Sequence, residues 1–201
     1  MTPTHYAAYF VRGSYAAQHM ALAYFITFTT YGTWLPGMAK GSVDREHNAF
    51  GTPWVPADEE RERLAREAMV QEPYVMRQSE RDMVCQAIVG LATDRHWQLL
   101  AMHVRSNHVH VVIAADRDPG RIMSDMKARA SRDLVRAGFG TADRRRWTRH
   151  GSTRHLFREA DICNKVRYTL NEQGERMAWY VHPEWNHCLE EPRTGQEPRT
   201  Q

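Results

Sequence analysis

Several features that mark other protein classes are missing from this chain of 201 residues. No apolar run approaches the roughly 20 residues that a membrane-spanning helix needs. The first residues lack the basic stretch followed by an apolar stretch that marks a secretory signal. No glycine-rich phosphate-binding loop occurs, so we expect no nucleotide cofactor. These absences predict a cytoplasmic protein without a membrane partner.

Cysteine is scarce and widely spaced. Cys85, Cys163 and Cys188 are odd in number and form no CxxC pair. A disulfide framework or a structural zinc site usually shows paired cysteines at short spacing, and a reducing compartment keeps thiols free. We therefore expect three buried or half-buried thiols and no structural zinc.

Positive charge, by contrast, is concentrated in one segment. The formal net charge is +3, yet residues 117–158 hold twelve Lys or Arg against four Asp, a local excess of eight. Such a segment can be a solvated helix face with a charged loop. It can also bind a polyanion, because each neutralised phosphate releases counterions. The charge pattern alone leaves both interpretations open.

The length suits a single domain, and no linker divides the chain. We expect this domain to span residues 20–190, with residues 1–19 as an N-terminal extension that can be disordered. The tail over residues 191–201, rich in Pro, Gly, Thr and Gln, is expected to be disordered. Residues 38–56, which glycine and proline interrupt repeatedly, are expected to form a loop.

Hydrophobic periodicity predicts the order of the elements. Strands are expected over residues 23–30, 97–105, 108–114 and 152–157, the second and third joined by a two-residue turn. Helices are expected over residues 58–70, from a cap at Ser79, between Asp118 and Gly138, and over residues 159–173. This order predicts an α+β fold, an antiparallel sheet with helices packed mainly on one face.

Two histidines alternate with valine in the strand expected over residues 108–114. Period two sends His108 and His110 to one face, about 7 Å apart, while Val109, Val111 and Ile113 point to the core. This spacing can chelate a metal ion on the exposed face of the strand. The alternative is a pair of solvent-facing or hydrogen-bonded imidazoles.

One tyrosine stands apart from the apolar stripe of the last expected helix. Ile162, Val166 and Leu170 recur every four residues and form its buried side. At 100° per residue, Tyr168 lies about 160° to 200° from Val166 and Leu170. Tyr168 therefore faces away from the stripe. It is either a surface residue, a residue that covers a second contact, or a functional group.

Six segments between residues 22 and 176 carry a family resemblance in their order along the chain. They are YFITFTTYGTWLPG, GSVD, VRSNHVHVVI, MKARASRDL, WTRHGSTRHLF and VRYTLNEQG. Together they resemble the single-tyrosine HUH transposases, which include bacterial insertion-sequence enzymes and proteins associated with repetitive extragenic palindromes. The resemblance implies a ferredoxin-like or RRM-like fold, a homodimer, and single-stranded or hairpin DNA as the partner.

The same resemblance implies the roles of three residues. His108 and His110 match the histidine pair that holds a divalent metal, Mg²⁺ or Mn²⁺, and Tyr168 matches the nucleophile. Two imidazoles and one further ligand leave positions on such an ion for phosphate oxygens. The expected reaction is cleavage and rejoining of single-stranded DNA through a 5′-phosphotyrosine intermediate, as in transposition.

The third metal ligand is left open by the sequence. In well-known members a glutamine stands one helical turn after the tyrosine, whereas this chain has Glu172 there and Gln173 next to it. Ideal helix geometry favours Glu172, about 40° round from Tyr168. Gln173 would require the helix to tighten or to end near Gly174.

Basic residues of the central segment are the candidates for DNA contacts. They combine guanidinium and ammonium groups for phosphates with one stacking surface. These residues are Arg121, Lys127, Arg129, Arg132, Arg136, Arg144, Arg145, Arg146 and Trp147. Two other functions remain as alternatives, namely a rolling-circle initiator-like nickase and a non-catalytic or domesticated protein that binds DNA hairpins.

Overall fold

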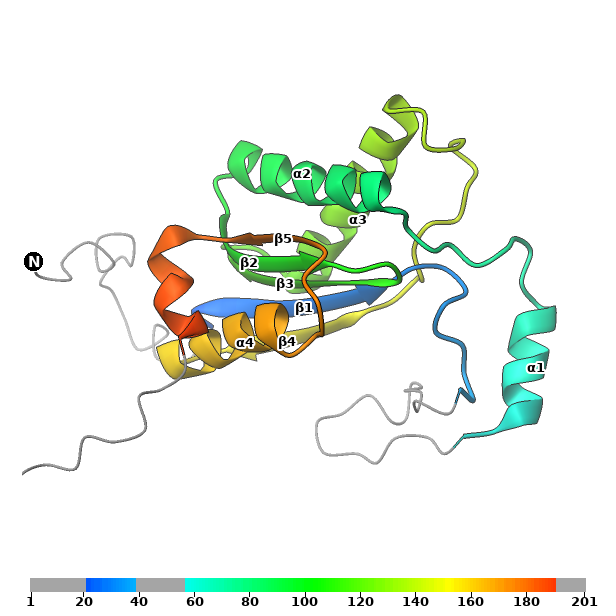
Figure 1. The fold of residues 1–201 in the computed structure, drawn as a ribbon, viewed down its shortest axis with the longest axis horizontal. Coiled ribbons are helices and arrows are strands. Elements are labelled where there is room, and N and C mark those ends of the chain that lie inside the picture. Colours follow the sequence, from blue (N-terminus) through cyan, green and yellow to red (C-terminus); the bar gives the residue numbers. More distant parts are fainter. Residues whose placement is uncertain (1–20, 39–56, 191–201) are drawn as a thin grey trace, which may run out of the picture.

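A computed structural model describes residues 21–38 and 57–190. Its centre is a five-stranded antiparallel sheet with the strand order β4-β1-β3-β2-β5 (Figure 1). The strands are β1 (Ala23–Thr29), β2 (Gln98–Val104), β3 (His108–Ala114), β4 (Ser152–Leu156) and β5 (Ala178–Val181). The predicted α+β class with an antiparallel sheet is confirmed. The expectations for residues 1–19, for most of the loop over 38–56 and for 191–201 lie outside the described residues.

Helices cover both faces of this sheet, so the expectation that they pack mainly on one face is wrong. They are α1 (Glu59–Glu67), α2 (Gln78–Asp94), α3 (Pro119–Arg136), α4 (Glu159–Asn171) and the 3₁₀ helix η3 (Pro183–Leu189). The two longest, α2 and α3, pack on one face over the larger apolar core. On the opposite face, α4 and η3 pack over a smaller core (Figure 1). The second face carries the histidine pair.

The alternation of side chains along β1 and β3 separates the two cores. Ile26 and Phe28 of β1 face α2 and α3, and so do Val109 and Val111 of β3. On the other side of β3, Val112 joins the smaller core beneath α4. A register shift between Leu99 and Ala101 interrupts the pairing of β2 with β3, as a β-bulge does.

Capping residues place two of the expected helix starts correctly. Asp58 accepts a hydrogen bond from the backbone N–H of Arg61 at 2.9 Å, and Asp118 accepts one from Arg121 at 2.9 Å. The expected cap at Ser79 is wrong, because α2 begins at Gln78. Here the Glu80 carboxylate reaches back and accepts from the Arg77 N–H at 2.8 Å, which satisfies a donor of the first turn.

The cysteines differ from the expectation of three thiols. Cys163 of α4 and Cys188 of η3 form a disulfide with a Cα–Cα distance of 5.1 Å, whereas Cys85 is a half-buried free cysteine. The two joined cysteines are 25 residues apart. They meet because η3 packs along α4, a tertiary contact that cysteine spacing does not reveal. In the described ranges, no helix has the length and apolar character needed to cross a membrane.

Candidate metal and nucleophile site

His110 lies at the centre of the candidate site, on the middle strand of the sheet. Its Nδ1 is 2.8 Å from the hydroxyl of Thr27, its cross-strand partner on β1. Its Nε2 is 3.1 Å from Oε1 of Gln173, which follows α4. Both ring nitrogens are therefore held by polar partners from elements far apart in the sequence.

The surroundings of His110 keep its imidazole neutral. The side chain is buried, with 6% of the residue exposed, so the expected exposed face of the strand is covered at this position. Burial lowers the pKa of His110 to about 3, and repulsion from His108 adds to the effect. A neutral imidazole is the form that binds a metal ion.

His108 stands next to His110 on the same face of β3. Their ring centroids are 4.8 Å apart. Nδ1 of His108 is 2.7 Å from the side-chain oxygen of Asn107 in the hairpin turn. A hydrogen bond at one ring nitrogen orients the imidazole and assigns metal binding to the other nitrogen. Asn107 is a residue whose supporting role the sequence analysis did not identify.

The structure brings Gln173, and not Glu172, to the histidines. The helix α4 ends at Asn171, Glu172 is exposed, and Gly174 has a positive φ of 74°. Because the backbone leaves helical geometry at this point, the ideal angle of 100° per residue no longer applies to Gln173. Its amide oxygen can then approach His110, as the distance of 3.1 Å shows.

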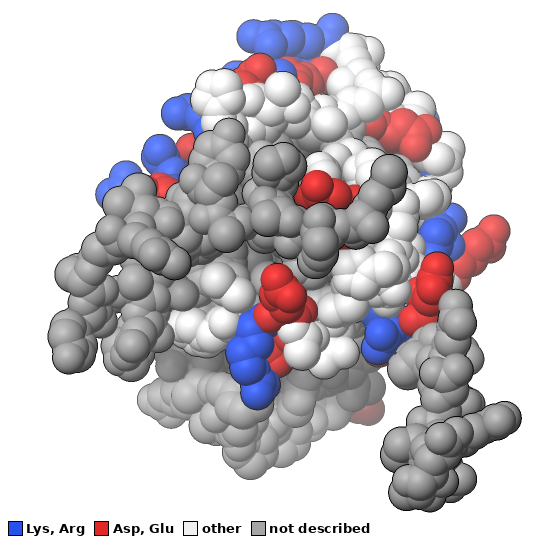
Figure 2. Space-filling model, turned by 90° about the vertical axis from the view of Figure 1, so that its left-hand side faces the viewer, with Lys and Arg blue, Asp and Glu red and all other residues white. Residues whose placement is uncertain are grey.

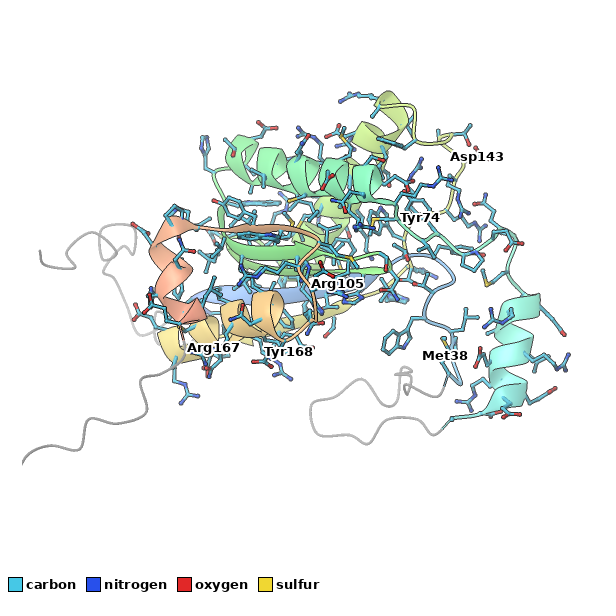
Figure 3. All side chains as sticks on the ribbon, viewed as in Figure 1. Met38, Tyr74, Arg105, Asp143, Arg167 and Tyr168 are labelled. Atoms are coloured by element: carbon cyan, nitrogen blue, oxygen red, sulfur yellow. A yellow bond between two sulfur atoms is a disulfide. The ribbon has the colours of Figure 1, made fainter. Side chains whose placement is uncertain are left out.

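Tyr168 lies on the side of α4 that faces the histidine strand. Its ring centroid is 5.6 Å from that of His110 and 5.8 Å from that of Phe25, both in edge-to-face contacts. The residue is half-buried, whereas Val166 and Leu170 are buried in the smaller core. Figure 3 shows Tyr168 on α4, beside the sheet. The tyrosine and the histidine pair therefore share one site.

Lys165 places a positive charge beside the tyrosine. Its Nζ is 4.7 Å from the centroid of the Tyr168 ring and 5.1 Å from that of Phe25. Partial burial lowers the pKa of Lys165, and repulsion from Arg154 on β4 lowers it further. The sequence analysis missed this residue, although its place three residues before Tyr168 puts it on the same helix face.

His103 supports the site from within the core. This fully buried residue of β2 pairs with His110 across the strands. Its Nε2 accepts a hydrogen bond from the backbone N–H of Met177 at 3.0 Å, so Nδ1 carries the proton and donates to the carbonyl of Thr169, also at 3.0 Å. One imidazole thus joins β2, the helix of Tyr168 and the segment that leads into β5.

The basic helix α3 lies on the opposite face of the sheet from Tyr168 (Figure 1). Arg129 forms ion pairs with Asp94 and Asp133, and Arg136 pairs with Asp133. Among the other candidates for DNA contact, Arg121, Arg132 and Arg145 are exposed. On the described part of the face drawn in Figure 2, acidic and basic side chains are mixed.

Three further candidates anchor the loop after α3. Nζ of Lys127 donates to the carbonyls of Thr148 and His150, and burial lowers the pKa of Lys127 to about 8. Arg146 is 2% exposed and donates to the carbonyl of Phe139. The Trp147 indole donates to the Lys127 carbonyl, and its ring meets Phe28 edge to face.

Arg144 is likewise held by hydrogen bonds to other parts of the chain. Its guanidinium donates to Oε1 of Gln71 and to the carbonyl of Pro73, both at 3.0 Å, and lies over the Tyr74 ring. The four residues Lys127, Arg144, Arg146 and Trp147 therefore hold this loop to the body of the protein. Of the candidates for DNA contact, the exposed guanidinium groups are those of Arg121, Arg132, Arg136 and Arg145.

The donor set of the site fits a divalent cation. Two imidazoles and one amide oxygen, from His108, His110 and Gln173, can hold a divalent cation and leave positions for phosphate oxygens. The structure therefore combines an antiparallel α+β sheet, a possible metal site on its central strand and a tyrosine beside it. This arrangement defines a candidate for metal-assisted chemistry on phosphate esters.

Comparison with protein families gives one partial match. Residues 70–158 match the family model described as "Transposase IS200 like", a segment that contains the β2–β3 hairpin with both histidines and the whole of α3. Over these residues, which are less than half of its length, the chain is similar to IS200-like transposases. The matched segment ends before α4, so the role of Tyr168 does not follow from it.

Among solved structures, one match is a REP-associated tyrosine transposase bound to a REP hairpin. It is 14% identical to this chain, the alignment covers 81% of this chain and 75% of that one, and the TM-score is 0.43. No curated protein matches the chain.

Proposed function

We propose that the protein cleaves and rejoins single-stranded DNA, with Tyr168 as the nucleophile and His108, His110 and Gln173 as ligands of Mg²⁺ or Mn²⁺. One observation carries this proposal. His110 meets Gln173 at 3.1 Å and the Tyr168 ring at 5.6 Å, although strand and helix are far apart in the sequence. A structural core would not need a histidine pair, an amide and a tyrosine at the same point.

The histidines are prepared for metal binding by their neighbours. When bound, a divalent cation would supply Lewis-acid polarisation of a phosphate oxygen. Burial keeps His110 neutral. With the ion bound, Nδ1 would carry the ring proton and donate it to the Thr27 hydroxyl, and Nε2 would be the ligating atom. The amide of Gln173 adds an oxygen ligand without adding charge.

In the proposed reaction the phenol oxygen of Tyr168 attacks the phosphorus of a DNA phosphodiester. A bond forms between this oxygen and phosphorus, and the bond from phosphorus to the leaving 3′ oxygen breaks. The phenol loses its proton to solvent, and the leaving oxygen takes up a proton to become a 3′-OH. The phosphotyrosine bond conserves the energy of the phosphodiester, so a second 3′-OH can reverse the attack and join new ends.

Lys165 supplies the positive charge nearest to the tyrosine ring among the groups described above. We assign it to the phosphate that Tyr168 attacks, because an ammonium group at this place stabilises negative charge that develops in the transition state. Lys165 needs no large movement to reach this phosphate, since its Nζ already lies 4.7 Å from the centroid of the Tyr168 ring.

Away from the site, the exposed guanidinium groups of Arg121, Arg132, Arg136 and Arg145 would contact the backbone of single-stranded or hairpin DNA. Because α3 is on the far face of the sheet, these contacts would hold a part of the DNA remote from the scissile phosphate. The homodimer and the cytoplasmic location that were expected from the sequence are part of the same proposal.

The test uses labelled single-stranded DNA from the regions that flank the gene, incubated with the full chain and Mn²⁺. Denaturing electrophoresis should show a labelled covalent adduct that chelation of the metal abolishes. Tyr168→Phe should form no adduct, whereas the control Tyr180→Phe, on β5, should form it normally. DNA cleavage without any adduct would instead indicate a hydrolytic metal nuclease.

A further inference from the structure

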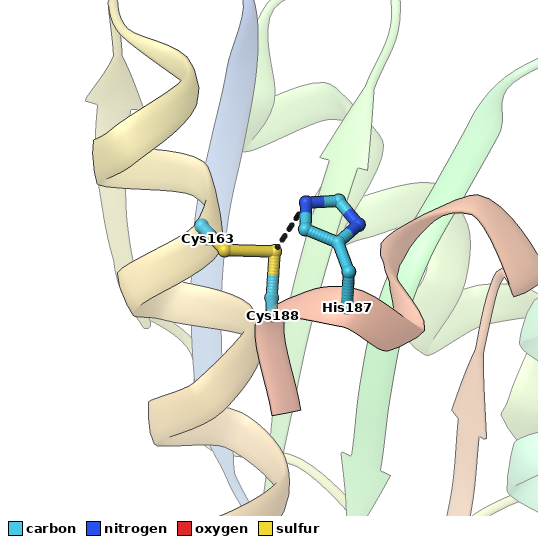
Figure 4. Close-up of side chains that lie close together, drawn as sticks. All are labelled: Cys163, His187 and Cys188. Atoms are coloured by element: carbon cyan, nitrogen blue, oxygen red, sulfur yellow. Dashed lines mark hydrogen bonds between the residues drawn. A yellow bond between two sulfur atoms is a disulfide. The ribbon is translucent and has the colours of Figure 1, made fainter. Parts of the chain in front are cut away.

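A second group of metal-binding side chains lies outside the proposed catalytic site, where α4 meets η3. It consists of Cys163, His187 and Cys188, whose possible ligand atoms all lie within 4.8 Å of one another. Figure 4 shows the disulfide between the cysteines and the imidazole of His187 beside Cys188. Nε2 of His187 is 3.4 Å from the sulfur of Cys188.

The orientation of His187 is that of a metal ligand. Its Nδ1 is 2.8 Å from the carbonyl of Glu184, so Nδ1 carries the proton and donates it. Nε2 therefore presents its lone pair to Cys188. A disulfide sulfur has no proton to donate, so in the oxidised form this contact gives the imidazole no hydrogen bond. A metal-bound histidine shows the same pattern, with a backbone carbonyl at one nitrogen and the ligand atom at the other.

The surroundings give an ion access to this group. A pocket of about 340 Å³ is lined by Cys163 and His187 and by the carboxylates of Glu159 and Glu184. A water molecule can complete a four-coordinate site. The Cα–Cα distance of 5.1 Å between the cysteines lets side-chain rotation separate two thiolates to the spacing of about 3.8 Å that a tetrahedral zinc requires.

We propose that Cys163, Cys188 and His187 form a zinc site when the disulfide is reduced. A thiol reductant supplies two electrons, the S–S bond breaks, and each sulfur gains a proton. Binding of Zn²⁺ then releases both thiol protons and forms two S–Zn bonds and one N–Zn bond. Thiolate ligands select zinc over the harder Mg²⁺ that the histidine pair of β3 would take. In a reducing compartment the thiol form is the stable one.

The site would fasten the tyrosine helix in either state. Cys163 lies on α4 five residues before Tyr168, and η3 carries the other two ligands. Two hydrogen bonds join the same elements independently, from Arg167 to the carbonyl of Cys188 at 3.1 Å and from Asn171 to that of Leu189 at 3.2 Å. Reduction therefore leaves η3 in place, and the three ligands stay close together.

Cobalt is the probe for this site, because thiolate ligands give Co²⁺ a charge-transfer absorption band that nitrogen and oxygen ligands do not. The full chain is reduced with a phosphine, desalted without oxygen and titrated with Co²⁺. We expect the thiolate band in the reduced protein and no band after oxidation to the disulfide. Added Zn²⁺ should abolish the band by displacing Co²⁺.

Variants assign the band to these residues. His187→Ala keeps both cysteines and should weaken Co²⁺ binding at least tenfold, and Cys163→Ser with Cys188→Ser should abolish the band. Cys85→Ser and His110→Ala should leave it unchanged. If the double variant does not fold, mass spectrometry of the parent decides, since Zn²⁺ should protect Cys163 and Cys188 but not Cys85 from alkylation. A band absent from the reduced parent, or lost in Cys85→Ser, overturns the proposal.

Discussion

His110 gains its proposed function from its neighbours and not from its position on a strand alone. A histidine with the same spacing on an open surface would be solvated and would titrate near its ordinary pKa of 6.5. Here burial lowers the pKa of His110 to about 3, and Thr27 and Gln173 hold its two nitrogens. The H-x-H pattern therefore identifies the candidate residues, and the contacts supply their chemistry.

Gln173 and Glu172 give a direct test of the proposed ligand set. We expect Gln173→Ala to weaken Mn²⁺ binding by about tenfold or more. Changes to residues that hydrogen-bond to metal ligands cost affinity in this range. Glu172→Ala should leave the affinity unchanged, because Glu172 is exposed and α4 has ended before it. Isothermal calorimetry measures both. A loss of affinity in Glu172→Ala alone would instead identify Glu172 as the third metal ligand.

Lys165 is expected to act on the rate of cleavage and not on folding. Lys165→Gln should reduce the single-turnover rate about 10²-fold or more, as the loss of one preorganised charge contact does, while Mn²⁺ binding stays unchanged. Lys165→Arg keeps the charge and should recover part of the rate. The exposed Arg95→Gln, at the end of α2 on the other face, is the matched control. Equal rates for Lys165→Gln and this control would remove Lys165 from the site.

Among the elements, the ends of helices proved harder to predict than their existence. Strand alternation predicted β1, β2 and β3 within two residues of their bounds, and Asp118 with Gly138 bracketed α3 correctly. The last helix was expected to reach residue 173 but ends at Asn171. That difference of two residues changes which side chain meets His110, because the backbone turns at Gly174.

Other features depend on tertiary contacts and leave little trace in the local sequence. Neither the four-residue strand β5 nor the 3₁₀ helix η3 was predicted. The Cys163–Cys188 pair follows from their packing. Lys165 acquires its place in the site only through the approach of α4 to the hairpin. The sequence thus predicted the antiparallel sheet and the histidine pair, but neither the helix layer on the second face nor the groups that support the histidines.

His103 shows how an element is fixed relative to its neighbours. His103→Ala should lower the free energy of unfolding by about 2–4 kcal/mol, because a buried side chain is lost and two backbone groups lose their partner. Urea denaturation measures this loss. The exposed His150→Ala should change stability by less than about 0.5 kcal/mol. Equal, small effects in both variants would show that His103 does not hold the tyrosine helix to the sheet.

At the scale of the whole molecule, the sheet separates the two proposed functions, cleavage chemistry and DNA contact, which the charge pattern alone did not distinguish. The proposed chemistry lies beneath α4, and the exposed arginines of α3 lie on the other face. Much of the local excess of positive charge is also used internally, in ion pairs and in the anchors of the loop after α3. DNA that contacts both faces would have to pass round an edge of the sheet.

The salt dependence of DNA binding tests the outer contacts. Neutralising Arg121, Arg132 and Arg136 together should reduce the slope of log affinity against log salt by about one unit for each lost phosphate contact. The cleavage rate at saturating DNA should be unchanged, since none of the three lies on the face of Tyr168. An unchanged slope would place the DNA entirely on the α4 face.

The most direct test of the account is to identify the residue that carries the DNA. The protein is incubated with single-stranded DNA and Mn²⁺, digested with nuclease and protease, and examined by mass spectrometry for a peptide with an attached nucleotide. The account predicts that the nucleotide is bonded through a 5′-phosphate to Tyr168. Attachment to another residue, such as Tyr180, or cut DNA with no modified peptide, would contradict it.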